Sequence, residues 1–181
     1  MEFVNKKPRI YVLSGKAGSG KTLLSTMIED IYFKKGKKSI SLAYASYLKE
    51  YAKNVLGWDG NEDTKPREFL QQVGVELIKT HIDEHMLVNR VVEDVKVYSY
   101  FYDVIIITDA RFEDEINYIK DNFENVSVIR VEGKRERGLT KEQKEHKTET
   151  GLDNFSKYDY VIENDGTVYD LRKKIEKIIG D

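Results

Sequence analysis

The chain has 181 residues, of which 40% are hydrophobic and 34% charged, a composition typical of one globular domain with a full-sized core. Its 30 basic and 32 acidic residues leave a net charge of −2, so we expect neither a nucleic-acid nor a membrane partner. The absence of cysteine excludes a disulfide scaffold, a thiolate metal site and a cysteine nucleophile. No signal-like apolar core and no run of membrane-spanning length is present, so we expect a cytoplasmic protein.

The first predicted strand, residues 9–14, is short and apolar and leads directly into a glycine-rich segment. That segment fits the pattern G-x-x-x-x-G-K-[ST], which is the P-loop. It consists of Gly15, Lys16, Ala17, Gly18, Ser19, Gly20, Lys21 and Thr22. Residues 23–35 follow with apolar side chains at helical spacing, so the motif lies between a strand and a helix, as an anion-binding loop requires.

This loop is expected to bind the phosphates of a nucleotide. Its glycines permit backbone angles that turn successive N–H groups toward a phosphate, whose charge the helix dipole also favours. Lys21 would reach the β- and γ-phosphates, and the Thr22 hydroxyl would be a ligand of Mg²⁺. The alternative is a glycine-rich turn that only resembles the pattern, and the flanking strand and helix argue against it.

The following stretch is mostly helical. We expect the first helix to end at the lysines around Gly36, and a second strand over residues 39–43. Three helices should then follow, one from Ser46, one capped by Asp63 or Thr64 with Pro66 in its first turn, and one from about Asp83. Their inward side chains are predicted to include Leu48, Ala52, Val55, Leu56, Phe69, Leu70, Val73 and Leu77. So much helix between two strands predicts an inserted subdomain, residues 44–101, that covers the P-loop and binds a second substrate.

The clearest strand, residues 102–108, is apolar throughout, as expected for a strand buried on both faces of a parallel sheet. Asp109 follows at its carboxyl end, where P-loop enzymes place an aspartate that holds Mg²⁺. Arg111 lies two residues further on and could bind a phosphate through its guanidinium. For Asp109 the competing role is a helix N-cap. For Arg111 it is a surface ion pair with Glu113 or Glu115.

The C-terminal part completes the predicted sheet. A helix over residues 112–120 precedes two further strands, over 126–131 and 158–163. The last helix opens with a capping-box-like pattern and is expected to bury Val168, Leu171, Ile175 and Ile178. Five strands alternating with helices predict an α/β fold with a five-stranded parallel sheet and right-handed crossovers. We expect one domain over 1–181, with a core of residues 8–43, 102–131 and 156–181.

Several charged and aromatic side chains are candidates for binding a second substrate. Lys49, Arg67 and Arg111 are the candidate cations, and Tyr44 is placed to touch a nucleobase. In the polar segment after residue 131, Arg135 and Arg137 are candidate catalytic residues of a lid, since arginines stabilise charge in phosphoryl transfer. A solvated loop is the competing view of that segment. His81 and His85 have helical spacing but no accompanying carboxylate signature, so we interpret them as surface residues.

These segments together resemble the P-loop kinases of the nucleoside monophosphate kinase group. Within that group, the chain is most similar to the deoxynucleoside monophosphate kinases of bacteriophages and bacteria. The resemblance covers nearly the whole length. Besides the P-loop, it rests on ASYLKE at 45–50, REFLQQVGVE at 67–76, TDARFEDE at 108–115, HKTETGLD at 146–153 and DYVIENDGT at 159–167.

The resemblance implies phosphorylation of a (deoxy)nucleoside monophosphate by ATP with Mg²⁺. The residues implied to hold the monophosphate are Lys49, Arg67, Gln71 and Arg111. Residues 132–155 would close as a lid, and the loop with Asn164 and Gly166 would lie near the adenine of ATP. Val75 stands where relatives usually have threonine, a departure that bears on recognition of the base or sugar, whereas Ala110 in place of valine looks neutral.

Two alternatives stay open at this point. The same fold could phosphorylate another small acceptor, as dephospho-coenzyme A and phosphomevalonate kinases do. A nucleotide-dependent switch or binding module without an acceptor is the second, and an arginine-rich lid argues against it. The sequence leaves open which base and sugar are accepted and whether two copies form a homodimer.

Overall fold

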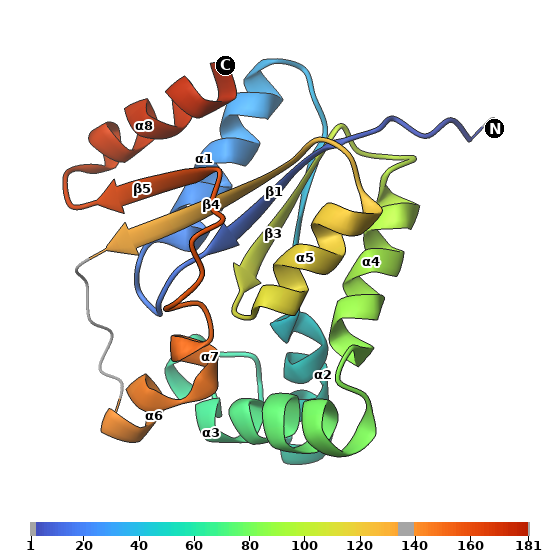
Figure 1. The fold of residues 1–181 in the computed structure, drawn as a ribbon, viewed down its shortest axis with the longest axis vertical. Helices are drawn as coiled ribbons and strands as arrows, with labels where there is room; N and C mark the ends of the chain where they lie inside the picture. The colour runs from blue at the N-terminus through green and yellow to red at the C-terminus, as the bar shows by residue number, and fades with distance from the viewer. Residues whose placement is uncertain (1–2, 134–139, 181) are drawn as a thin grey trace.

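The computed structural model describes residues 3–133 and 140–180. Five parallel strands form one sheet in the order β2-β3-β1-β4-β5 (Figure 1). They are β1 (Arg9–Ser14), β2 (Ser39–Leu42), β3 (Val104–Ala110), β4 (Val126–Gly133) and β5 (Tyr160–Asn164). The strand that precedes the P-loop is therefore the central one, and the predicted α/β fold with a five-stranded parallel sheet is confirmed.

Helices cover both faces of the sheet and the edge formed by the carboxyl ends of its strands (Figure 1). They are α1 (Lys21–Lys34), α2 (Ala45–Leu56), α3 (Arg67–Gln71), α4 (Met86–Tyr98), α5 (Glu113–Asn122), α6 (Lys141–Glu145), α7 (Lys147–Thr150) and α8 (Val168–Gly180). A 3₁₀-helix, η1 (Glu62–Thr64), and a π-helix, η2 (Gln72–Ile82), lie between β2 and β3. Within the described parts of the chain, none of the helices combines the length and apolarity needed to cross a membrane.

Two large apolar clusters hold the sheet between its helices. Ile10 and Val12 belong to the cluster shared with α4 and α5. Tyr11 and Leu13, the alternate residues of the same strand, belong to the cluster shared with α1 and α8. The alternation follows from the pleat of a strand, and burial on both faces explains why the strands read as continuous apolar runs.

A third and smaller cluster lies among the helices between β2 and β3. It consists of Leu48, Ala52, Leu70, Ile78 and Leu87. Three residues predicted to face inward are instead exposed, namely Val55 (68%), Leu56 (51%) and Leu77 (49%). In the π-helix η2 the hydrogen bonds run between residues five apart, so Val73 and Ile78, rather than Leu77, share the buried side.

The ends of two helices follow the sequence expectations. Gly36, with a φ of 69°, follows the last turn of α1. At the start of α8 the predicted capping box is formed: the Thr167 N–H donates to Asp170 Oδ2 at 2.8 Å, and the Asp170 N–H donates to Thr167 Oγ1 at 3.2 Å. Val168 was expected to be buried but is 61% exposed, because the first turn of α8 stands at the mouth of a cleft.

Candidate active site

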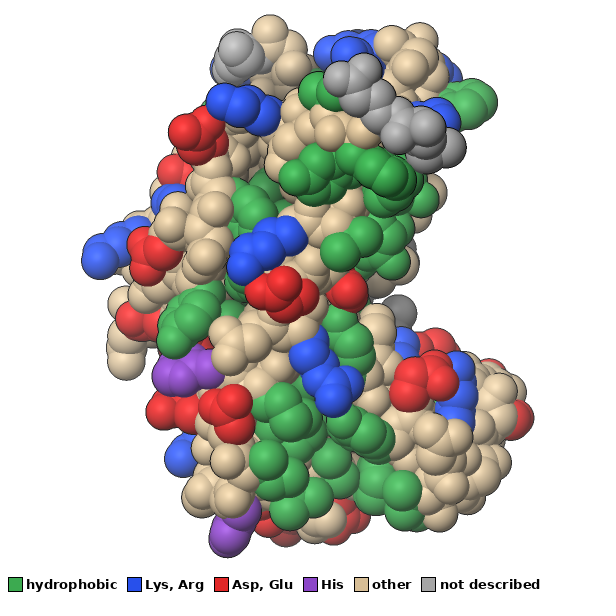
Figure 2. All heavy atoms as spheres, turned by 90° about the vertical axis from the view of Figure 1, so that its right-hand side faces the viewer, with side chains coloured by type: hydrophobic (Ala, Val, Ile, Leu, Met, Phe, Trp, Pro, Cys, Tyr) green, Lys and Arg blue, Asp and Glu red, His purple; other side chains and the backbone are tan. Residues whose placement is uncertain are grey.

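A cleft with a volume of about 1610 Å³ opens at the carboxyl ends of the strands, between the sheet and the inserted helices. Figure 2 shows the molecule hollowed at this level, between its upper, sheet-bearing part and the helices below. A single small-molecule pocket usually occupies up to about 1,000 Å³, so this cleft has room for two ligands. The predicted site residues that line it are Ala17, Gly18, Gly20, Lys21, Thr22, Tyr44, Lys49, Arg67, Gln71, Asp109, Arg111, Asn164 and Gly166. Arg135 and Arg137 lie outside the described residues.

The P-loop is held in its curled form by close packing from two neighbouring strands. Gly15 and Gly20 have φ angles of 146° and 107°, in the region that favours glycine. A Cβ atom on Gly15 would collide with the carbonyl oxygen of Val131, and one on Gly20 would collide with the Asn164 side chain. That side chain also donates to the carbonyl oxygen of Ser19 at 2.9 Å. Asn164, predicted to lie near a bound adenine, thus braces the loop itself.

Lys21 lies inside the curl of the loop. Its ammonium group donates to the carbonyl oxygens of Gly15 at 2.7 Å and of Lys16 at 2.9 Å. Burial lowers the pKa of Lys21 to about 7, and the nearby Arg111 guanidinium acts in the same direction. The Ser19 hydroxyl is buried without a hydrogen-bond partner in the part of the chain that the structure describes. A desolvated cation and an unsatisfied hydroxyl, both at a helix N-terminus, fit the polyphosphate of a nucleotide.

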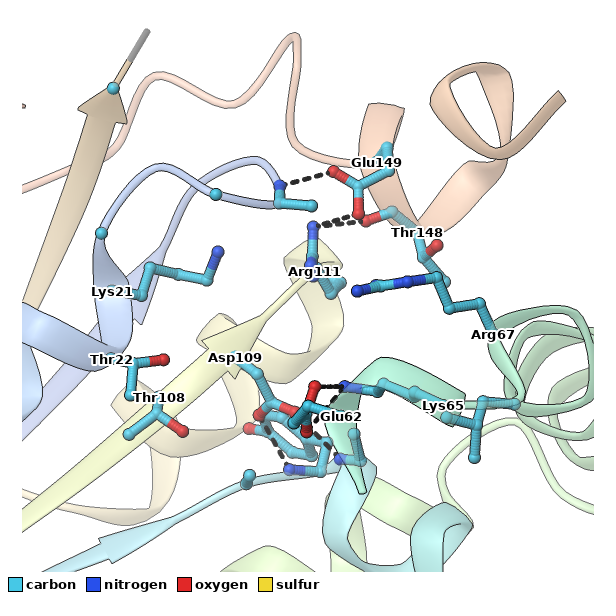
Figure 3. Close-up of a pocket in the computed structure, with 18 of the residues that line it drawn as sticks. Lys21, Thr22, Glu62, Lys65, Arg67, Thr108, Asp109, Arg111, Thr148 and Glu149 are labelled. Atoms are coloured by element: carbon cyan, nitrogen blue, oxygen red, sulfur yellow. Dashed lines mark hydrogen bonds and ion pairs between the residues drawn. The ribbon is translucent and has the colours of Figure 1, made fainter. Parts of the chain in front are cut away.

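Thr22 and Asp109 line the same side of the cavity (Figure 3). Both carboxylate oxygens of Asp109 accept backbone N–H groups, from Tyr44 and from Ala45, each at 2.9 Å. The carboxylate therefore also fixes the start of α2. Residues 3–133 and 140–180 contain no group of three or more His, Cys, Asp or Glu side chains placed to hold a metal. Mg²⁺ bound through nucleotide phosphates needs only one or two protein ligands, so the Thr22 hydroxyl and the Asp109 carboxylate fit such an ion.

Tyr44 lines the cleft wall, yet most of its side chain belongs to the core. It is only 3% exposed, and its hydroxyl donates to the carbonyl oxygen of Glu115 at 2.9 Å. The predicted contact with a nucleobase would therefore have to use the ring edge or the backbone. The Glu115 carboxylate accepts the N–H groups of Arg111 and Phe112 at 2.6 and 3.1 Å. Burial nevertheless raises the pKa of Glu115 to about 8.

Arg111 projects into the cleft between the P-loop and the inserted helices (Figure 3). Its guanidinium pairs with Glu149 at 2.8 Å and donates to the carbonyl oxygen of Thr148 at 3.1 Å. The competing view, a surface ion pair with Glu113 or Glu115, does not match this arrangement, because Arg111 pairs with a residue of the predicted lid. Glu149 also accepts the Ala17 N–H at 2.8 Å, a contact that joins residues 132 positions apart. No pattern in the sequence indicates that Glu149 contacts Arg111 and Ala17.

A second group of cations faces the P-loop from the inserted helices. Lys49 and Lys65 both pair with Glu62, at 3.0 and 3.1 Å, and sequence reasoning had missed Lys65. Burial lowers the pKa of Lys65, with neighbouring Lys49 the next cause. Figure 3 shows the Arg67 side chain extending toward Arg111, and no described carboxylate pairs with it. Gln71 donates to the Thr148 hydroxyl at 3.2 Å.

A family model described as deoxynucleotide monophosphate kinase matches residues 20–175. No curated protein matches the chain significantly. Among solved structures, an APS kinase of Mycobacterium tuberculosis is 9% identical with a TM-score of 0.56, covering 97% of this chain and 99% of that one. A sugar kinase from Janibacter is 14% identical with a TM-score of 0.57, covering 96% of this chain and 95% of that one. A shikimate kinase from Aquifex aeolicus is 12% identical with a TM-score of 0.50, covering 94% of this chain and 96% of that one. At these identities the similarity shows the fold of P-loop kinases and nothing narrower.

Proposed function

Because the chain belongs to the deoxynucleotide monophosphate kinase family, an ATP-dependent phosphotransferase family, we propose that its cleft holds two nucleotide sites side by side. The single observation that carries this division is the presence of two separate groups of cations on opposite walls. Lys21 lies on the P-loop wall, Arg67 and Lys65 lie on the opposite wall, and Arg111 lies between them. Lys49 belongs to the second group because it shares the partner Glu62 with Lys65. A switch without an acceptor has no use for the second group.

On the donor side, the P-loop N–H groups and Lys21 bind the phosphates of ATP. Thr22 and Asp109 would hold the Mg²⁺ ion, which on binding neutralises phosphate charge. Arg111 is placed to stabilise the charge that develops on the phosphoryl group as it passes in line to the acceptor. No side chain forms a covalent intermediate. Arg135 and Arg137, which lie outside the described residues, remain candidates for the same stabilising role because of the family resemblance.

On the acceptor side, Lys49, Arg67 and Gln71 bind the monophosphate, within an inserted region of residues 44–101. Residues 132–155 act as the lid that excludes water and so limits ATP hydrolysis. Val75 also lines the cleft, which keeps it a candidate for recognition of the base or sugar. A cytoplasmic location, where both substrates are available, is part of the same proposal.

The test is release of ADP from ATP–Mg²⁺ in a coupled assay with single acceptors. The panel contains dGMP, dTMP, dCMP and dAMP, their ribo forms, dephospho-coenzyme A and phosphomevalonate. We expect one or a few deoxynucleoside monophosphates to raise turnover far above the rate with ATP alone. Stimulation by a non-nucleotide acceptor alone would overturn the substrate assignment. If no acceptor raised turnover while ATP still bound, the division of the cleft into two substrate sites would be wrong.

A further inference from the structure

The described part of the lid includes residues 147–153, called here the lid segment, and it rests directly on the P-loop. Lys16 pairs with Asp153 at 3.1 Å, and the Ala17 N–H donates to Glu149. Gly151 approaches so closely that a Cβ atom there would lie 2.7 Å from the carbonyl oxygen of Arg111. The lid segment therefore leaves no space for even a methyl group at this contact.

Glu149 is the most enclosed acid of this contact, with its side chain 9% exposed. One carboxylate oxygen accepts the Ala17 N–H at 2.8 Å, and the other pairs with the Arg111 guanidinium at 2.8 Å (Figure 3). These partners are of the two kinds that bind a nucleotide phosphate, a P-loop N–H group and a guanidinium. A carboxylate resembles the edge of a phosphoryl group, since both present two negatively charged oxygens to a pair of donors. In the structure Glu149 thus occupies donors that a substrate phosphate would need.

We propose that Glu149 is an internal substitute for a phosphate of the donor nucleotide. It holds the lid segment on the P-loop until the polyphosphate displaces it, and displacement frees Arg111 for the transferred group. The proposal rests on the P-loop being the ATP site but is independent of which acceptor is used. It has a quantitative consequence. Because only molecules with Glu149 displaced can bind the polyphosphate, the apparent affinity is reduced by the fraction of molecules in that state.

The test is calorimetric titration of ATP–Mg²⁺, and separately of inorganic tripolyphosphate, without any acceptor. Glu149→Gln keeps the size of the side chain but removes the charge that pairs with Arg111. We expect its dissociation constants for both ligands to fall about tenfold, the size of effect expected when one charge-assisted contact no longer competes. The matched control is Glu142→Gln, which removes an exposed carboxylate from α6, and it should bind like the unchanged protein.

A second variant reaches the same contact without altering Glu149. Gly151 has an ordinary helical φ of −60°, so Gly151→Ala adds no backbone strain, yet its methyl group would push the lid segment away from Arg111. It should also bind tripolyphosphate more tightly. Unchanged affinity in both variants would overturn the proposal. So would weaker binding together with a lower kcat in Glu149→Gln, because Glu149 would then position Arg111 rather than compete. Tighter tripolyphosphate binding without stimulation by any acceptor would support the proposal and contradict the division of the cleft into two substrate sites.

Discussion

The two walls of the cleft present positive charge in different ways. On the P-loop wall the donors are backbone N–H groups and one partly buried lysine, fixed by glycines against which β4 and β5 pack closely. On the opposite wall they are the ends of long side chains, and two of them, Lys49 and Lys65, share one half-exposed acid, Glu62. The backbone geometry of the first wall is organised before a ligand arrives, although its Ala17 N–H group has to exchange Glu149 for a phosphate. The second has to exchange its internal ion pairs for a substrate phosphate, so its contribution should depend more on which substrate is bound.

The largest effect is expected from Lys21→Met, which removes the cation of the P-loop wall. We expect kcat to fall about 10³-fold, since a preorganised donor to the transferring phosphates is lost. We also expect the melting temperature without ligand to stay the same or rise, because burying an ammonium group is costly. Coupled ADP release and thermal unfolding measure the two effects. A loss of activity below tenfold would show that the P-loop wall does not depend on this cation.

The next effect concerns the opposite wall, formed by the inserted helices. Arg67→Met should raise KM for the accepted monophosphate about 10- to 100-fold, as loss of a charged hydrogen-bonding partner predicts, and should leave ATP affinity unchanged. Lys49→Met is the matched comparison and should have a smaller effect, because Lys49 is already paired with Glu62. Steady-state kinetics with calorimetry of ATP binding separates the two parameters. If Arg67→Met weakened ATP binding as strongly as acceptor binding, the two walls would not be independent.

The smallest effect is the uptake of a proton by Lys21, on the P-loop wall, when ATP binds. The pKa of Lys21 is lowered to about 7 without ligand, and a phosphate beside the ammonium should raise it again. ATP binding at pH 8 should therefore take up a fraction of one proton more than at pH 6, where Lys21 is already protonated. Calorimetry in buffers of different ionisation enthalpy measures this uptake. The pH difference should disappear in Lys21→Met, and its persistence there would assign it to another group.

The lowered pKa of Lys21 also makes the stability of the ligand-free protein depend on pH. Between pH 7 and 10.5 the unfolded chain keeps a proton on Lys21 that the folded, ligand-free protein does not. Stability without ligand should therefore rise with pH through this window. Bound ATP, which restores the charge of the lysine, should flatten that rise.

Features encoded in neighbouring residues could be predicted from the sequence. The P-loop, its strand and its helix form one continuous pattern, and β3, which contains Asp109 near its end and is followed by Arg111, is another. The parallel sheet follows from the alternation of strands and helices. These predictions depend on local periodicity and on turn chemistry, which tertiary packing did not override.

Features that depend on distant contacts or on unusual local geometry could not be predicted from the sequence. Nothing near Glu149 in the sequence indicates that it meets Ala17, because the fold alone joins them. Helical periodicity assumes repeats of three and four residues, so it placed Leu77 inward where the π-helix buries Ile78. Lys65 follows a loop and precedes a proline, a context in which a lysine is usually at the surface.

The position of β1 also has a consequence for synthesis on the ribosome. This strand is central in the sheet, yet it is made before both of its partners, which begin at Val104 and Val126. The support of the P-loop comes later still, from Asn164 on β5. Nascent chains that end before Asn164 lack this support for the loop, so nucleotide cannot assist the early stages of folding. Any factor that retains the emerging chain would have to cover β1 until β3 and β4 have been made.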